Sequence, residues 1–120
     1  MATLTVQTAA PFTALNHTLA AASTADVFAN DGNTFLLFLN TNASARTLTI
    51  AQNPTDKPGF GTITPAPVVL TIPGSGTNGG VCMIGRFPTG RFNNASDQVS
   101  YTIDVVTGLT VGAVKLTPVA

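Results

Sequence analysis

The sequence predicts an all-β protein, a single-domain β-sandwich or jelly roll of about eight strands. The first observation is composition: twenty of the 120 residues are Thr, Lys occurs twice, and Glu does not occur. Thr suits a half-exposed strand, whereas Glu, Lys and Arg normally populate exposed helix faces. The second observation is a period-two alternation of apolar and polar residues, and the third is a close spacing of Gly-, Pro- and Asn-rich turns. Together these patterns are typical of two packed sheets.

The length fits one domain with one core. Within it we expect residues 1–12 to form an N-terminal strand or arm, and residues 13–120 to form the sandwich. Leu4 and Val6 lie on the same face of the strand expected in the arm. Only 13–25 has helical spacing, and its Thr and Ser content disfavours a helix.

Two further segments alternate cleanly, so each is expected to be a strand buried on one side. They are 46–52, with Leu48 and Ile50 inward, and 98–104, with Val99, Tyr101 and Ile103 inward. The loop sequence that includes Gly108 predicts a tight turn with a positive φ at this glycine.

Segment 34–40, "TFLLFLN", carries apolar residues on both faces, as do 81–85 and 109–116. Such a strand is central in a stack or faces another subunit. Turn signals on both sides of 34–40 predict a hairpin that leads into 46–52. We expect the exposed side of 34–40 and 109–116 to be a self-association face. The residues assigned to it are Leu36, Phe38, Val114 and Leu116.

Charge and side-chain inventory exclude several functions. Five Lys and Arg balance five Asp, so the basic excess of a nucleic-acid-binding protein is missing. One His and one Cys cannot form a zinc site, and no nucleophile motif is present. We therefore expect no enzymatic activity, no cofactor and no metal. The longest apolar run, "FLLFL", is too short for a membrane span, and the N-terminus lacks the pattern of a secretion signal.

Segment 84–94, "IGRFPTGRFNN", concentrates two of the three arginines around aromatic residues. One interpretation is a projecting surface that docks on a partner, because Arg and Phe are enriched in interface cores. The other is a structural corner, in which Phe87 and Phe92 close one end of the sandwich and Arg86 and Arg91 lie over it. Residue types favour the structural corner.

Three blocks, 26–52, 69–76 and 84–116, together resemble the small capsid decoration or cement proteins of tailed bacteriophages. The resemblance is carried by "NDGNTFLLFLN", by "IGRFPTGRFN" and by "VTGLTVGAVKL", in this order. Arg86 stands where that family often has Pro, and 53–67 has no counterpart that aligns. The resemblance implies a jelly-roll subunit that binds the outside of an assembled head, often as a trimer.

On this basis we expect a non-enzymatic virion protein, made in the host cytoplasm, that binds the major capsid protein and stabilises the shell. The expected capsid contacts are Leu4, Val6, Pro11, Phe12, Arg86 and Arg91. The alternatives are a carbohydrate-binding or adhesin-like module on a virion surface, or another phage head or tail component. Sugar platforms usually expose Trp or Tyr, and this chain has no Trp and one Tyr.

Overall fold

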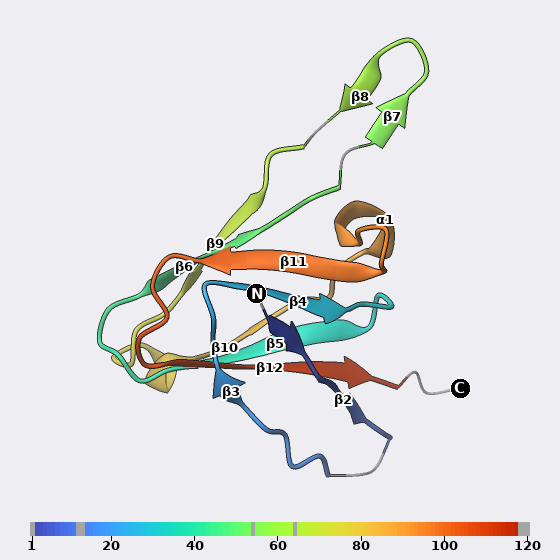
Figure 1. Cartoon of the computed structure of the whole chain (residues 1–120). Helices are drawn as coiled ribbons and strands as arrows, with labels where there is room; N and C mark the ends of the chain where they lie inside the picture. The colour runs from blue at the N-terminus through green and yellow to red at the C-terminus, as the bar shows by residue number, and fades with distance from the viewer. Residues whose placement is uncertain (1, 12–13, 54, 64, 118–120) are drawn as a thin grey trace.

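The structure, a computed structural model, describes residues 2–11, 14–53, 55–63 and 65–117, and it confirms an all-β single domain of two packed sheets (Figure 1). Sheet A consists, in spatial order, of β1 (Ala2–Leu4), β4 (Ala25–Ala29), β11 (Gln98–Ile103), β6 (Arg46–Ile50) and β9 (Val68–Ile72). Sheet B consists, in spatial order, of β10 (Val81–Ile84), β5 (Thr34–Asn40), β12 (Leu109–Leu116) and β2 (Val6–Ala9), and β3 (Ala20–Ala21) also pairs with β12. Eight of the described strands have four or more residues, the number that the sequence predicts.

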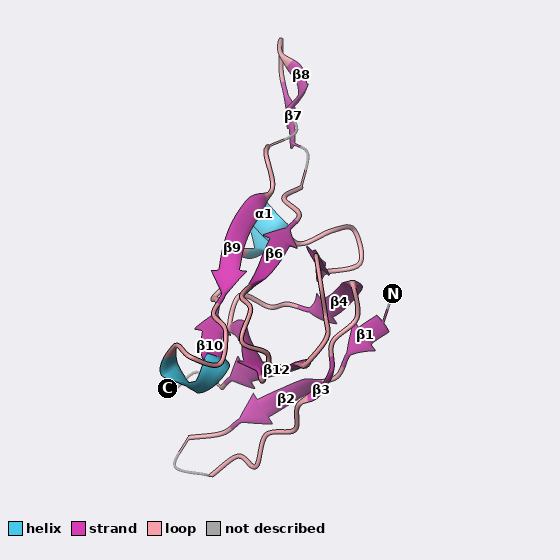
Figure 2. Cartoon of the chain, turned by 90° about the vertical axis from the view of Figure 1, so that its left-hand side faces the viewer, coloured by secondary structure: helices cyan, strands magenta, loops and turns pink. Residues whose placement is uncertain are grey.

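Four small elements lie outside the two sheets. β7 (Thr55–Lys57) and β8 (Gly61–Ile63) form a separate antiparallel hairpin, which extends away from the sandwich in both views (Figures 1 and 2). A 3₁₀ turn (Asn78–Gly80) precedes β10, and a one-turn helix, α1 (Thr89–Phe92), follows it. The radius of gyration is 15.3 Å, against roughly 13–14 Å for a compact chain of this length, because the hairpin lengthens the molecule.

The core lies between the sheets and is closed by aromatic rings. Leu48, Ile50 and Tyr101 point inward from sheet A, as their alternation predicts, and each is at most 2% exposed. The ring of Tyr101 lies 6.2 Å from that of Phe38 on sheet B, in an edge-on arrangement. Full burial of one large apolar side chain contributes about 1.5–3 kcal/mol, so these rows supply most of the stability.

The predicted hairpin from 34–40 into 46–52 is wrong. β5 pairs with β10 and β12 in sheet B, whereas β6 pairs with β11 and β9 in sheet A. The cause is Asn40, a fully buried residue at the end of β5. Its amide group donates to the carbonyl oxygens of Ser44 (2.9 Å) and Pro73 (3.1 Å), and its Oδ1 accepts from the backbone N–H of Asn42. These bonds direct the chain across the sandwich to the other sheet.

The N-terminal segment joins both sheets of its own chain. β1 pairs in parallel with β4, and β2 pairs in parallel with β12, with Thr5 between the two strands. Leu4 and Val6 are half-buried and pack against the core. Within the described residues of 13–25 there is no helix, as the Thr and Ser content predicts, and the regular elements there are β3 and the first residue of β4.

Candidate interaction surfaces

The arginine-rich corner, residues 84–94, covers one end of the core and is not a free loop. Phe87 and Phe92 are 3% and 8% exposed, and their rings meet edge to face at 5.7 Å. Phe87 also packs on Phe28 of the core, with ring centroids 5.4 Å apart. These contacts confirm the structural interpretation of "RFPTGRF".

Both arginines of the corner lie over it and contact their own chain. The Nε of Arg86 donates to the carbonyl oxygen of Gly32 (3.2 Å), and the Nε of Arg91 donates to Oε1 of Gln52 (2.6 Å). The guanidinium of Arg91 also lies 5.2 Å from the centre of the Phe92 ring, a cation–π contact. Both side chains remain exposed, so they form the rim of the corner and not its interior.

Two buried asparagines connect this corner to the turn before β5. The side-chain amide of Asn30 donates to the carbonyl oxygen of Phe87 (2.9 Å) and to Oδ1 of Asn93 (2.7 Å). In return, the amide of Asn93 donates to the backbone carbonyl of Asn30 (2.8 Å). Asn30 and Asn93 are 63 positions apart in the sequence, and only their positions in the fold reveal that they pair.

The expected capsid contacts in the arm fall in different environments. Leu4 and Val6 are half-buried and pack against the core of their own chain, and each also lines a cavity. Pro11 is exposed. Phe12 lies outside the described residues.

The expected self-association residues need a correction. Leu36 and Phe38 are 0% and 1% exposed and point into the core, so neither can contact a second chain. Val114 lies on the opposite, outer side of sheet B but is only 3% exposed, and of the four residues Leu116 alone is exposed, at 45%. A strand that is apolar on both faces carries no signal for which face turns inward.

Apart from Gln7 and Thr110, the side chains of sheet B that point outward are apolar, and we call these apolar side chains the outer face. It consists of Phe35, Leu37 and Leu39 on β5, Val81 and Met83 on β10, and Val114 and Leu116 on β12. Leu39 lies opposite Val81, and Leu37 lies opposite Met83. Val81 and Met83 are 49% and 65% exposed. None of these side chains is charged, so this surface suits contact with another macromolecule.

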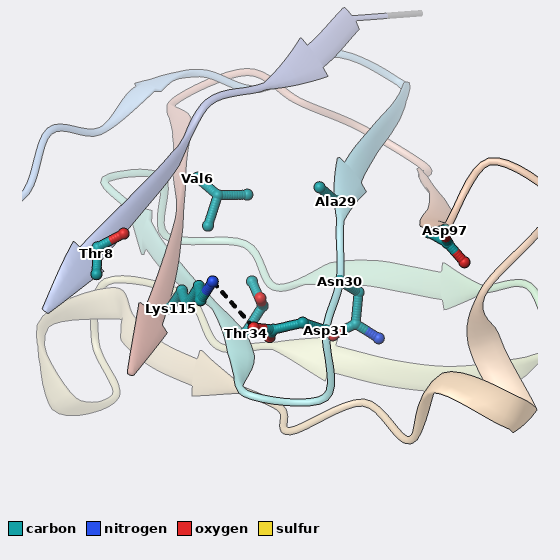
Figure 3. Close-up of a pocket in the computed structure, with 8 residues that line it drawn as sticks. All are labelled: Val6, Thr8, Ala29, Asn30, Asp31, Thr34, Asp97 and Lys115. Carbon is teal, nitrogen blue, oxygen red and sulfur yellow. Dashed lines mark ion pairs between the residues drawn. The ribbon is translucent and has the colours of Figure 1, made fainter. Parts of the chain in front are cut away.

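Two cavities flank the N-terminal strand. Figure 3 shows the one of about 300 Å³, where Lys115 of β12 reaches Asp31 across the mouth, with Nζ 3.1 Å from Oδ2. The backbone N–H of Asn33, and then Lys115, hold the pKa of the Asp31 carboxyl below its usual range. The other cavity, of about 410 Å³, is lined by Leu4, Gln7 and Gly112 among others.

Asp26, Tyr101 and Ser23 form a mostly buried polar group at the edge of the second cavity. The hydroxyl of Tyr101 donates to Oδ2 of Asp26 (3.1 Å), and the hydroxyl of Ser23 donates to Oδ1 (2.8 Å). Burial, and next the carboxylate of Asp26, raise the pKa of Tyr101 above its usual value. Because Tyr101 is 2% exposed, it cannot stack on a sugar ring.

The remaining reactive groups do not assemble. Cys82 packs against the core from β10, and burial raises the pKa of its thiol. In the described part of the chain, no three His, Cys, Asp or Glu side chains lie close enough together to hold a metal ion. Over the same residues, no helix has the length and apolarity needed to cross a membrane.

The β7–β8 hairpin is not among the strands that the sequence predicts. Its turn is Pro58-Gly59-Phe60, with Gly59 at φ 81° and Gly61 at φ 74°. Phe60, at the tip, is 83% exposed. The available signal was the phenylalanine between two glycines, which marks a tight turn but not a projection from the body.

Comparisons of this chain with protein-family models, with curated proteins and with solved structures found no match.

Proposed function

We propose that this protein is a non-enzymatic virion protein that binds the outer surface of a phage capsid and stabilises the assembled shell. Its partner is the major capsid protein. It acts as a homo-oligomer, and the resemblance to capsid decoration proteins implies that this oligomer is a trimer. The observation that supports this proposal most is the outer face of sheet B, which is apolar, uncharged and most exposed along β10. A soluble monomer rarely leaves such a surface without a function.

The mechanism is binding energy. A protein that binds the assembled shell but not the separated subunits stabilises the shell by mass action. A lattice offers many equivalent sites, and an oligomer can engage several of them at once, so modest contacts add through effective concentration. A net charge of zero leaves no long-range repulsion to oppose this assembly.

The contact surface proposed for the shell is the outer face, rather than the N-terminal arm. Leu4 and Val6 pack against the core of their own chain. Val81 and Met83, by contrast, are exposed on the edge strand β10. The alternative of a carbohydrate-binding module has less support, because the single tyrosine is buried and the chain has no tryptophan.

Co-sedimentation with capsid shells tests the proposal. The wild-type protein should pellet with assembled shells, not bind separated subunits, and raise the temperature at which the shells lose their contents. Met83→Asp should weaken the binding at least tenfold, because it places a charge in the apolar contact. Val105→Asp is the matched control, since Val105 is 44% exposed in a loop away from the outer face.

A wild-type protein that fails to bind shells would refute the proposed function. Equal losses for Met83→Asp and Val105→Asp would refute the assignment to the outer face.

A further inference from the structure

The β7–β8 hairpin extends away from the two sheets. It continues beyond the ends of β6 and β9, and in both views it lies apart from the other described elements (Figures 1 and 2). Residues 58–63 are all exposed, and a Cβ built on Gly59 or Gly61 would meet nothing within 4 Å. An isolated two-stranded hairpin is at best marginally stable in water, so this one has little stability of its own.

The tip of the hairpin has the character of an anchor. Phe60 is the most exposed large hydrophobic residue of the described chain, at 83%, and Ile63 beside it is 46% exposed. An aromatic side chain buries on the order of 150–250 Å² in a contact. Such residues, when they fill a pocket on a partner, dominate binding.

A groove that fits such an anchor lies at the base of the same hairpin. Its volume is about 310 Å³, and its lining includes Ile50 at the end of β6, Val68 and Leu70 on β9, and Ile84 on β10. We call it the base groove. It opens between β9 and β10, the edge strands of sheets A and B, neither of which has a further described neighbour on this side.

The arginine-rich corner forms the rim of the base groove. Arg86, Pro88 and Arg91 line it, beside the buried rings of Phe87 and Phe92. No carboxylate among the described side chains forms an ion pair with either arginine. Arg91 already packs its guanidinium on one phenylalanine ring, and a second ring in the groove would find the same type of cation–π contact.

A hairpin cannot fill its own base groove, because it points away from the sandwich (Figures 1 and 2). We infer that the β7–β8 hairpin of one copy inserts Phe60 into the base groove of a second copy of this chain. The contact joins two different surfaces, so it closes either as a reciprocal pair, with the two hairpins antiparallel, or as a ring. The ring gives the trimer of the proposed function.

This inference rests on the self-association part of the proposed function and does not depend on shell binding. It also assigns different tasks to two apolar surfaces: the hairpin and base groove join copies, and the outer face of sheet B remains open for the shell. The two assignments predict different phenotypes for Phe60 and Met83 variants, so they can fail separately.

Light scattering over a concentration series tests the contact. The wild type should be an oligomer, Phe60→Ser should have the mass of the 12.2 kDa chain, and Met83→Ser should remain an oligomer. Met83 is the matched control because it is an apolar residue, 65% exposed, outside the hairpin and the groove. Circular dichroism should show the same fold for all three, since both substituted side chains are exposed.

A wild type that is monomeric at every concentration would overturn the inference. So would an oligomer that survives Phe60→Ser but dissociates with Met83→Ser, because the outer face would then be the self-association surface.

Disulfide trapping locates the contact independently. In a Cys82→Ala background, one preparation carries Pro58→Cys near the tip and another carries Pro88→Cys at the groove rim. After mixing and mild oxidation, the two chains should join by a disulfide, whereas Pro58→Cys mixed with Met83→Cys should not. Joining only in the second mixture would place the tip on the outer face and refute the assignment.

Discussion

At the scale of single residues, buried polar side chains decide features that the apolar pattern leaves open. Asn40 directs the chain from one sheet to the other, and Asn30 with Asn93 fixes the corner that Phe87 and Phe92 close. Asp26 is 1% exposed and accepts hydrogen bonds from Tyr101 and Ser23. A buried polar group without its partner costs about 1–3 kcal/mol, so each of these residues specifies one arrangement of the chain.

Tyr101 offers a residue-scale prediction, because it is the only tyrosine and its ionisation can be followed in the whole protein by ultraviolet absorbance. Burial and the Asp26 carboxylate raise its pKa in the folded state. The unfolded value is about 10, so the contribution of this group to stability is present below about pH 10 and is lost as the pH rises further.

The native protein should therefore show no phenolate absorbance at pH values where the urea-unfolded protein is fully ionised. Phenolate should appear only together with unfolding, followed by circular dichroism. A native protein that titrates near pH 10 with its fold intact would contradict the burial of Tyr101. Tyr101→Phe should lower the free energy of unfolding by about 1–2 kcal/mol, because Asp26 loses a donor.

At the scale of elements, the sequence predicted strands better than it predicted their partners. Alternation correctly placed Leu48, Ile50 and Tyr101 inward, because polar side chains mark the opposite face. Alternation failed for Leu36 and Phe38, because β5 is apolar on both faces and either set of alternate side chains could face the core. The β5–β6 hairpin failed because a turn signal reports a change of direction, not the sheet that the next strand joins.

The candidate surfaces divide in the same way. The sequence predicted that the arginine corner is a closure, and it predicted that 34–40 and 109–116 leave an apolar side exposed. It could not reveal the hairpin or the base groove. Both depend on where β6 and β9 end in space, and the groove brings Ile50, Val68 and Ile84 together from three strands.

The loop that leads from β9 in sheet A to β10 in sheet B packs against Asn40, and this contact gives a prediction at the scale of elements. Gly80 has a φ of 76°, and a Cβ at this position would collide with the carbonyl oxygen of Asn40. Gly80→Ala should therefore lower the free energy of unfolding by more than about 1 kcal/mol, measured by urea denaturation. Gly76→Ala is the control in the same loop, where a Cβ meets nothing within 4 Å. Equal effects of the two substitutions would show that Asn40 does not hold this loop closely.

At the scale of the whole molecule, the protein is built with very little charge. Of 120 residues, ten are charged, and among the described residues one ion pair is formed, between Lys115 and Asp31, with both side chains about 40% exposed. Exposed pairs of this kind contribute about 0–1 kcal/mol. The stability of the fold must therefore come from apolar burial and hydrogen bonds.

At the scale of the whole molecule, we expect stability and shell binding to depend little on ionic strength. Between about 0.1 M and about 1 M sodium chloride, screening should change the free energy of unfolding by less than about 1 kcal/mol. Shell binding measured by co-sedimentation should also persist at the higher salt concentration, because the outer face is uncharged. Release of the protein from shells by salt alone would show that charged groups, and not the outer face, carry the binding.

The pairing of the N-terminal strand with β12 has a consequence for synthesis. β12 lies between β5 and β2, so sheet B has no centre until residues 109–116 have left the ribosome. Until then β2 lacks the edge to which it adds, and the two apolar sides of β5 lack most of their cover. Sheet B can therefore form only after residues 109–116 have been synthesised, and β2, near the beginning of the sequence, depends on β12 for its pairing.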